Sequence, residues 1–504
     1  MTLAFYNLAA ELAMLCGEFE VMEQFVDTAI AQAHTLLEQI NVYRTRIFSN
    51  ICQNKLTSAI DIARGLLEQL GVTFPDSPTE NDIQQAMAEI EQLIGNRKIE
   101  DLVHLPQMID EEKIAIVQIV NPILPVAFII GSPLFPLLVS LLVKLFLQYG
   151  NTSASAYGYI CYSIILCNRL QDVDLAVQFS QLASNLILKF EAKEITPSVV
   201  TVQAIFIIPR KSHIKETLLP LNESYITALE VGDLDYVGRS AYTYCVNAFW
   251  SGRLLIPLEE EARAYCNGLV QLKQLTTANY CRIYWQSVLN LLQTVEHTSI
   301  LSGEALQEAE LLPHLIEAND FFGLYFFYLC KLMLAYLFKD IQSAQHHAAE
   351  LKRYLVAGFG LIIEPTFYFY DSLTVLATLS PDSEETVEAL EKVKQNQTQL
   401  QQHWAYHAPM NYQHKVDLVE AEKCRVLGQK AEAIEFYDRA ISGAKTNEYI
   451  HEEALANELA AKFFLDWGKP YIAQDYIIKA YYGYAHWGAK AKVADLEKRY
   501  PQLL

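Results

Sequence analysis

The feature that most constrains this chain is a pair of helical patterns near its C-terminal end. Residues 421–440, AEKCRVLGQKAEAIEFYDRA, predict two helices joined by a tight turn at Gly428. Small and aromatic side chains recur where the paired helices must approach closely; they are Ala421, Cys424, Ala433, Tyr437 and Ala440. One such hairpin cannot bury its apolar face alone, so the stretch predicts an array of stacked hairpins.

The same pattern occurs twice more in the chain. About forty residues later a second hairpin turns at Gly468, and the chain opens with a third that turns at Gly17. Their small and aromatic positions are Ala461, Phe464, Ala473, Ile477, Ala480, Ala10, Ala13, Phe25 and Ala29. The pattern is typical of tetratricopeptide repeats, and no sustained alternation of period two requires a sheet. We predict an all-α fold, a tetratricopeptide-like α-solenoid of antiparallel helix hairpins with a C-terminal closing helix.

The predicted closing helix covers residues 489–500. A stack of repeats needs a polar last helix to shield its final hydrophobic face. The charged residues expected to do this are Lys490, Lys492, Asp495, Glu497, Lys498 and Arg499. An aromatic cluster precedes this helix, formed by Tyr481, Tyr482, Tyr484 and Trp487. We expect the cluster to pack between the last hairpin and the closing helix, the alternative being a platform that stacks a ligand.

Three segments are predicted along the chain. Residues 1–105 form N-terminal helical repeats, residues 106–400 form central irregular repeats, and residues 401–504 form C-terminal tetratricopeptide-like repeats with the closing helix. In the first segment, the spacing of Ser77 and Glu80 predicts a capping box at the start of a helix. The run Glu259–Glu261 is expected to be a solvated helix start.

Residues 114–143 form a stretch of thirty residues without a formal charge, which is long enough to suggest a transmembrane helix. Four prolines interrupt it, namely Pro122, Pro125, Pro133 and Pro136. Prolines at this density are expected to break one helix into two or three short ones. We predict that the stretch is buried core, with a membrane span and an apolar partner-binding surface as the alternatives.

The composition excludes some functions. A net charge of −21 with no basic stripe argues against nucleic-acid binding, and the dispersed acidic residues indicate solvated outer helix faces. Nine cysteines without framework spacing predict a reducing, cytoplasmic compartment. Six of them are expected to lie within apolar helical patterns, namely Cys52, Cys161, Cys245, Cys281, Cys330 and Cys424.

No catalytic or cofactor motif stands out. The pair Gly468-Lys469 is followed by Pro470, which lacks the backbone donor that a phosphate-binding loop needs. Neither a nucleophile elbow nor the protein-kinase signatures occur. We therefore predict no catalytic, cofactor-binding or metal-binding residue, and a chain that is not itself an enzyme.

Three histidines suggest an alternative to a non-catalytic chain, namely a metal-binding or hydrolytic site. His403 and His407 are four residues apart, which would place two imidazoles on one helix face, and His414 follows. No glutamate lies between the first two, and Pro409 ends the helix. Surface or turn histidines are the prediction, and a hydrolytic or metal-dependent enzyme with a site near His403 and His407 is the alternative. The adjacent His346 and His347 are expected to be structural.

Several stretches resemble the helical-repeat region of large multi-domain signalling kinases. Near the C-terminus they are residues 414–441, 452–469 and 480–501; near the N-terminus they are residues 16–43 and 59–75. In that family a serine/threonine kinase domain and a predicted AAA-type ATPase come first, and a GAF sensor and often a histidine kinase follow the repeats. The family's catalytic positions have no counterpart here. The resemblance implies a linking and regulatory module that is a fragment, a split gene product or a stand-alone repeat protein.

The sequence therefore predicts a non-catalytic protein-interaction and regulatory scaffold of a signal-transduction kinase. The expected partners are kinase, ATPase or sensor modules, bound at the concave surface formed by the inner helices of the array. No cofactor, nucleic acid or membrane span is expected.

Overall fold

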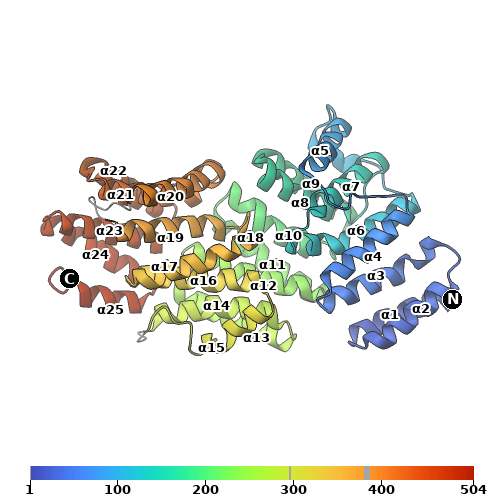
Figure 1. Cartoon of the computed structure of the whole chain (residues 1–504), viewed down its shortest axis with the longest axis horizontal. Helices are drawn as coiled ribbons and strands as arrows, with labels where there is room; N and C mark the ends of the chain where they lie inside the picture. The colour runs from blue at the N-terminus through green and yellow to red at the C-terminus, as the bar shows by residue number, and fades with distance from the viewer. Residues whose placement is uncertain (1, 294–296, 380–385) are drawn as a thin grey trace. The chain divides into compact units, whose positions relative to one another are not determined.

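The computed structural model describes residues 2–293, 297–379 and 386–504 (Figure 1). No strand forms within these ranges, where the extended pairings are two isolated bridges, Gln107–Asn151 and Ser302–Gln307. The predicted all-α class is confirmed. The chain forms two compact units, residues 1–199 and 200–504. Neither predicted division, at 105/106 or at 400/401, coincides with this boundary, and the three-segment organisation stays a prediction.

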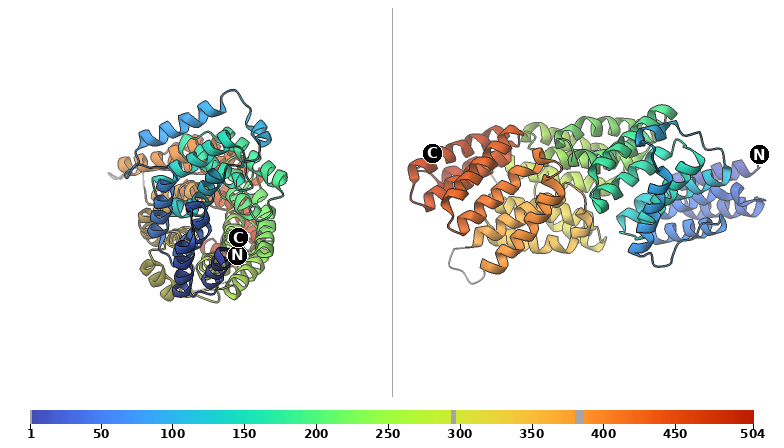
Figure 2. Two further views of the ribbon diagram at one scale, coloured as in Figure 1. Left: turned by 90° about the vertical axis from the view of Figure 1, so that its right-hand side faces the viewer. Right: turned by 90° about the horizontal axis from the view of Figure 1, so that it is seen from above.

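The first unit consists of helical hairpins. Its helices are α1 (Thr2–Leu15), α2 (Phe19–Gln32), α3 (Leu36–Cys52), α4 (Leu56–Gln69), α5 (Glu80–Ile94), α6 (Glu111–Ile129), α7 (Leu134–Tyr149), α8 (Ser155–Ile165) and α9 (Val173–Phe190), with short turns η1 (Ile99–His104) and η2 (Leu166–Leu170). Helix α10 (Thr196–Val202) spans the unit boundary. Helix α1 pairs with α2, as the sequence pattern predicts, and α3 pairs with α4 (Figure 1); the same N-terminal helices are drawn in dark blue in Figure 2.

The apolar stretch at residues 114–143 is buried core, as predicted. It forms two helices, α6 and α7, which separate at Gly131 and Ser132. Pro122 and Pro125 lie inside α6 instead of ending it. Both prolines are on its half-buried side, while Ile119 and Ile123 are fully buried, so packing holds the helix together where two backbone hydrogen bonds are missing.

Helix α6 alone, among the described residues, is long and apolar enough to cross a membrane, and half of its apolar window is buried inside the first unit. It packs against α3, α4 and α7. A single helix of this kind is weak support for a membrane span, because core helices of soluble proteins meet the same criteria.

Two local predictions in the first unit are wrong. The capping box of α5 is formed by Thr79 and Asp82, and not by Ser77 and Glu80. Both pairs have the required spacing, but only the later one lets the Asp82 carboxylate accept from both the backbone and the hydroxyl of Thr79. Cys52 lies exposed at the end of α3, outside the apolar face.

The second unit carries most of the array. Its helices are α11 (Leu218–Val231), α12 (Leu234–Trp250), α13 (Leu255–Gln271), α14 (Leu275–Leu292), α15 (Glu308–Glu317), α16 (Phe321–Leu337), α17 (Ile341–Leu351), α18 (Leu355–Gly358), α19 (Ile363–Thr378), α20 (Thr386–Gln399), α21 (Pro409–Val426), α22 (Lys430–Thr446), α23 (Ile450–Asp466), α24 (Pro470–Trp487) and α25 (Lys490–Arg499). Short turns are η3 (Gln203–Ile207), η4 (Ile208–Arg210), η5 (Ile214–Thr217), η6 (Lys352–Tyr354) and the π-helical η7 (Leu400–Ala405).

The hairpins predicted around Gly428 and Gly468 are confirmed. Both glycines adopt left-handed backbone conformations, with φ of 71° and 75°, where a side chain would be strained. The predicted small and aromatic positions are buried at the α21–α22 and α23–α24 contacts; these are Ala421, Cys424, Ala433, Tyr437, Ala440, Ala461, Phe464, Ala473, Ile477 and Ala480.

Inner and outer helices of the second unit are buried to very different extents. The outer helix α22 buries a single stripe, Ala433, Tyr437, Ala440 and Ala444. The inner helices α12, α14, α16, α19, α21 and α23 are buried along most of their length. Burial on both sides means that the inner helices contact something beyond their own hairpin partners.

The additional contacts come from segments far away in the sequence. Trp487 Nε1 donates to the carbonyl of Arg253, 234 residues earlier, at 3.1 Å. Lys492 Nζ on α25 donates to the carbonyl of Leu337 at 2.6 Å. The array within the second unit therefore closes on itself, and its C-terminal hairpins pack against its earlier helices.

The closing helix α25 differs from its prediction in one respect. It forms where predicted, and Arg499 caps the carbonyl of Phe338. Lys492, expected at the polar surface, is fully buried. In the aromatic cluster before α25, Tyr484 and Trp487 are buried as predicted, whereas Tyr482 is exposed.

Candidate functional site

The three histidines of the alternative hypothesis lie in different surroundings. His403 is in the π-helical turn η7, where its carbonyl accepts a hydrogen bond of 2.5 Å from Arg210. Burial and the Arg210 charge lower the pKa of its imidazole. His407 lies between η7 and α21, and His414 is buried within α21 beside Glu452.

These histidines do not form a metal site. Within the described part of the chain, no group of three or more His, Cys, Asp or Glu side chains is placed to hold a metal ion. His414 instead contributes to a buried ionic cluster. The donor set on which the metal-dependent alternative rested is therefore not assembled.

The buried cluster is centred on the carboxylate of Glu452 on α23. His414 Nε2 and Lys415 Nζ, both on α21, contact the same oxygen of this carboxylate. Burial alone would raise the pKa of Glu452, but the charges of Lys415 and His414 outweigh it and hold that pKa well below its usual range. Burial lowers the pKa of the neighbouring His451 to about 4. Glu452 is therefore ionised in the fold, and His451 is neutral.

A second buried network joins α23 to α25. Glu458 receives Lys492 at 3.0 Å, Lys339 at 3.2 Å and the Tyr484 hydroxyl at 2.9 Å. Burial opposes ionisation, but Lys339 and Lys492 lower the pKa of Glu458 to about 2. In an open array, the charged residues of the inner helices would face solvent. In this array they are buried and form ion pairs with one another.

The predicted concave binding surface is therefore wrong for the second unit. The inner faces of α21 and α23 pack against earlier segments, as the hydrogen bonds of Asn411 show. Its amide donates to the carbonyls of Pro209 and Ser212, at 3.1 and 2.8 Å, and accepts from the backbone of Ile214. At these contacts the inner faces of α21 and α23 are covered by the chain itself, so a partner cannot bind there.

The predicted solvated run at Glu259–Glu261 is also partly wrong. Glu259 accepts from Arg263 and from the indole of Trp285, each at 2.8 Å. Glu261 pairs with Arg253. Only Glu260 of the three is exposed, because the other two carboxylates are taken up in side-chain contacts that local sequence does not show.

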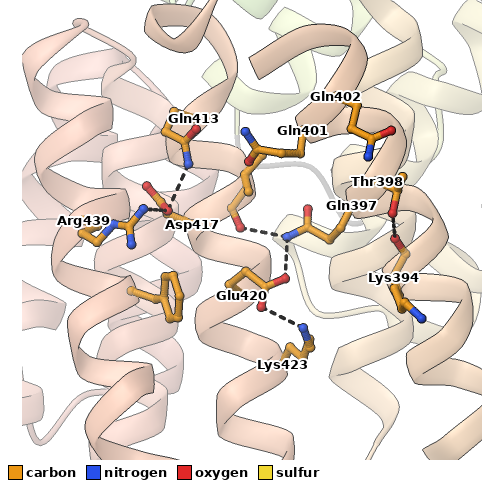
Figure 3. A pocket seen from close by; sticks show the side chains of 12 residues that line it. Lys394, Gln397, Thr398, Gln401, Gln402, Gln413, Asp417, Glu420, Lys423 and Arg439 are labelled. Carbon is orange, nitrogen blue, oxygen red and sulfur yellow. Dashed lines mark hydrogen bonds and ion pairs between the residues drawn. The ribbon is translucent and has the colours of Figure 1, made fainter. Parts of the chain in front are cut away.

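An open groove on the outer side of α21 is the best candidate site. It lies among α20, η7, α21 and α22 and has a volume of about 370 Å³ (Figure 3). Its lining is mostly polar, consisting of Lys394, Gln397, Thr398, Gln401, Gln402, Gln413, Val416, Asp417, Glu420, Lys423, Phe436 and Arg439. The polar residues recur every three or four positions on α20 and α21, so each helix presents one face to the groove.

Within the groove, Asp417 pairs with Arg439 and Glu420 pairs with Lys423, while Lys394 pairs with Glu391 outside it. Asp417 accepts from Arg439 at 2.7 Å and from Gln413 at 3.2 Å. Glu420 accepts from Lys423 at 2.8 Å and from Gln397 at 3.1 Å. These pairs fix the carboxylates on the helical floor of the groove, as Figure 3 shows.

The amides of the groove retain free hydrogen-bonding capacity. The Gln397 side chain is 7% exposed, and its nitrogen is used by Glu420 and the carbonyl of Val416. Its oxygen, Oε1, is buried without a partner among the described residues. The amides of Gln401 and Gln402 make no side-chain hydrogen bond within the described part of the chain. Three amides at one groove are therefore available to a ligand.

A second hollow in the first unit lacks these features. It lies between α5 and α7, with a volume of about 500 Å³, and is crossed by an ion pair of 2.7 Å between Lys144 and Glu89. The hydrogen bond from Lys144 lowers the pKa of Glu89. No buried, unpartnered polar atom is found among its lining residues.

The groove was not predicted from the sequence. The signal present was compositional, since residues 395–402 read QNQTQLQQ and four of the eight side chains, Gln397, Thr398, Gln401 and Gln402, line the groove. The π-helical turn η7, of a kind that is often found at functional sites, supplies the last two. Which glutamines share a face depends on this local change of helix geometry.

Comparisons with known proteins add little to these observations. No protein-family model and no curated protein matches the chain. Among solved structures, a circular tandem repeat protein with novel repeat topology and enhanced subunit contact surfaces shares 12% identity over 100% of this chain and 95% of its own, with a TM-score of 0.15. A score this low carries no argument, so the class, an α-helical repeat protein, rests on the hairpins described above.

Proposed function

We propose that this chain is a non-catalytic protein-interaction scaffold, and that partners bind at the groove among α20, η7, α21 and α22. The observation that carries the proposal is that the inner helices of the second unit are buried, while this outer groove keeps amides without a side-chain partner among the described residues. Loops are not needed to build the site, because its lining residues lie on three helices and the π-helical turn η7.

The proposed context is regulation of a signal-transduction kinase, with kinase, ATPase or sensor proteins as partners. The resemblance of residues 414–441 and 452–469 to the repeat region of signalling kinases supports this context. We place the scaffold in the cytoplasm, where disulfides are rare, since none of the nine cysteines forms a disulfide.

Affinity capture from the source cells tests the function. Tagged full-length chain is compared with Thr398→Trp, which fills the groove from an exposed position, and with Gln395→Trp, an exposed position on the same helix outside it. We expect wild type and Gln395→Trp to recover kinase, ATPase or sensor proteins, and Thr398→Trp to lose them. Recovery of no such protein by folded wild type would contradict the proposal.

A further inference from the structure

We propose that the groove binds an extended segment of a partner polypeptide, by pairing its glutamine side chains with the backbone of that segment. This inference rests on the proposed function, because it names the kind of partner surface that the scaffold would recognise. Three properties of the groove support it, namely the chemistry of its lining, its length and its charge.

The chemistry of the lining matches a peptide backbone. A glutamine amide carries one acceptor oxygen and two N–H donors, so it can pair with both the N–H and the C=O of a peptide unit. Gln401 and Gln402 have both functions available, and Gln397 offers its oxygen alone. An extended segment presents donors and acceptors along its length, whereas a helical segment has used them internally.

The buried oxygen of Gln397 points most directly to a donor on the ligand. Its amide cannot rotate to hide this atom, because the nitrogen donates to both Glu420 and the carbonyl of Val416, at 3.1 and 3.0 Å. A buried acceptor without a donor is unfavourable. A backbone N–H entering the groove would complete its hydrogen bonding.

The length of the groove sets the size of the segment. Lys394 and Gln402 are eight residues apart on α20 and η7, which corresponds to about 12 Å along a helix. An extended chain rises about 3.3 Å per residue, so roughly four residues would span this length. Phe436, which is half-buried, provides an apolar contact for a side chain of such a segment.

The charge of the groove favours a neutral or acidic segment. Lys394, Lys423 and Arg439 line it with two carboxylates, in a chain whose net charge is −21. Both carboxylates already accept from two partners within the groove. A basic segment would find no free counter-ion, while an acidic one would lie beside Lys394, which is exposed and pairs with the exposed Glu391 outside the groove at 3.4 Å.

A random octapeptide library displayed on phage and selected on the full-length protein tests this inference. Dissociation constants of the selected peptides, measured by fluorescence anisotropy, are compared across variants. We expect Thr398→Trp to abolish binding and Gln401→Ala with Gln402→Ala to weaken it roughly tenfold, as expected for the loss of a few hydrogen bonds. Gln395→Trp is the matched control and should bind as wild type does.

The peptide backbone is tested separately. Methylating the peptide nitrogens of a selected peptide one at a time should weaken binding at two or more adjacent positions, because each change removes a donor without altering a side chain. Selection of no peptide, unchanged binding to Thr398→Trp, or indifference to every backbone methylation would overturn the inference. The fold of each variant is first checked by circular dichroism and by its urea unfolding midpoint, so that misfolding is not counted as loss of binding.

These results separate the inference from the proposed function. If the chain captures signalling proteins from cells but selects no peptide, the scaffold function is supported and the peptide-binding groove is contradicted. If the chain selects peptides that bind through their backbone but captures no signalling protein, the peptide-binding groove is supported and the proposed function is contradicted.

Discussion

In the first unit, none of the described Asp, Glu, Lys or Arg residues is buried, whereas the second unit buries nine of them. The nine are Arg210, Lys331, Asp371, Lys415, Asp417, Glu422, Glu452, Glu458 and Lys492. Charged residues of the first unit pair at its surface, as Arg46 does with Glu23 and Asp27.

The number of buried charged residues reflects how far the inner helices of a repeat array are covered by other segments of the chain. An inner face that remains open to solvent can carry charges at little cost, because water screens them. In the second unit, α21 and α23 are covered by earlier segments, so every inner charge needs a partner of opposite sign or a hydrogen bond. The same kind of hairpin therefore has different requirements in the two units.

The units can be followed separately in solution. All five tryptophans, Trp250, Trp285, Trp404, Trp467 and Trp487, belong to the second unit. Tryptophan fluorescence therefore reports its unfolding alone, while circular dichroism reports the helices of both units.

The largest effect is expected from removing the centre of the buried cluster. Glu452→Ala leaves Lys415 buried without its counter-charge, and we expect the second unit to lose about 3–5 kcal/mol of unfolding free energy. Urea unfolding followed by tryptophan fluorescence measures this loss. The exposed Glu432→Ala is the control; an equal effect of both changes would show that the cluster does not stabilise the closed array.

A smaller but still substantial loss of unfolding free energy is expected from Asn411→Ala. The Asn411 side chain joins Pro209, Ser212, Ile214 and Tyr449 through hydrogen bonds of 2.8–3.1 Å, and all of them except the one to Ser212 are buried. Removing it leaves several buried polar groups unpaired, so we expect about 2–4 kcal/mol of destabilisation in the same fluorescence experiment. A loss below about 0.5 kcal/mol would mean that water replaces these bonds.

Acid should destabilise the second unit selectively. His451 has its pKa lowered to about 4 in the fold, so below the unfolded value of about 6.5 the unfolded chain binds a proton that the folded chain does not. Stability is then lost as pH falls from about 6.5 to 4, by roughly 1–3 kcal/mol. Depressed carboxylates such as Glu458, with a pKa of about 2, extend the loss below pH 4.

The measurement is the urea midpoint of the fluorescence transition at pH 7.5 and at pH 4.5. His451→Asn, which removes the titrating group, should reduce the difference between the two midpoints. Identical midpoints at both pH values in the wild type would contradict a neutral, buried His451.

The smallest effect is expected at the surface of the first unit. Glu23→Ala removes one partner of Arg46, whose side chain keeps Asp27 at 2.6 Å. Exposed ion pairs contribute little, so we expect less than about 1 kcal/mol, measured by thermal unfolding with circular dichroism. A loss as large as that of Glu452→Ala would remove the distinction between the units.

The sequence could predict the elements whose causes are local. The hairpins at Gly17, Gly428 and Gly468 were predicted because a left-handed turn and the spacing of small residues depend only on near neighbours. It could not predict the groove, because the facing of Gln397 and Gln401 depends on a π-helical turn and on the separation of α20 from α22.

Predictions from local sequence were wrong where tertiary packing outweighed the local preference of a residue. Pro122 and Pro125 should end a helix, yet α6 continues through them because its opposite side is buried against three other helices. The position of Lys492 in the sequence predicts that it lies on a polar helix surface. It is buried instead, because its ammonium group donates hydrogen bonds to Glu458 and to the carbonyl of Leu337.

By itself, the sequence determined an all-α chain of paired helices, since hydrophobic periodicity and turn residues act over a few positions. Only the tertiary structure decided that the second unit closes on itself, through contacts 155–234 residues apart. Such contacts leave no periodic signal, because each partner is compatible with the surface of its own helix. That closure buries the inner charges, fills the concave face and leaves the amide-lined groove on the outer side of α21.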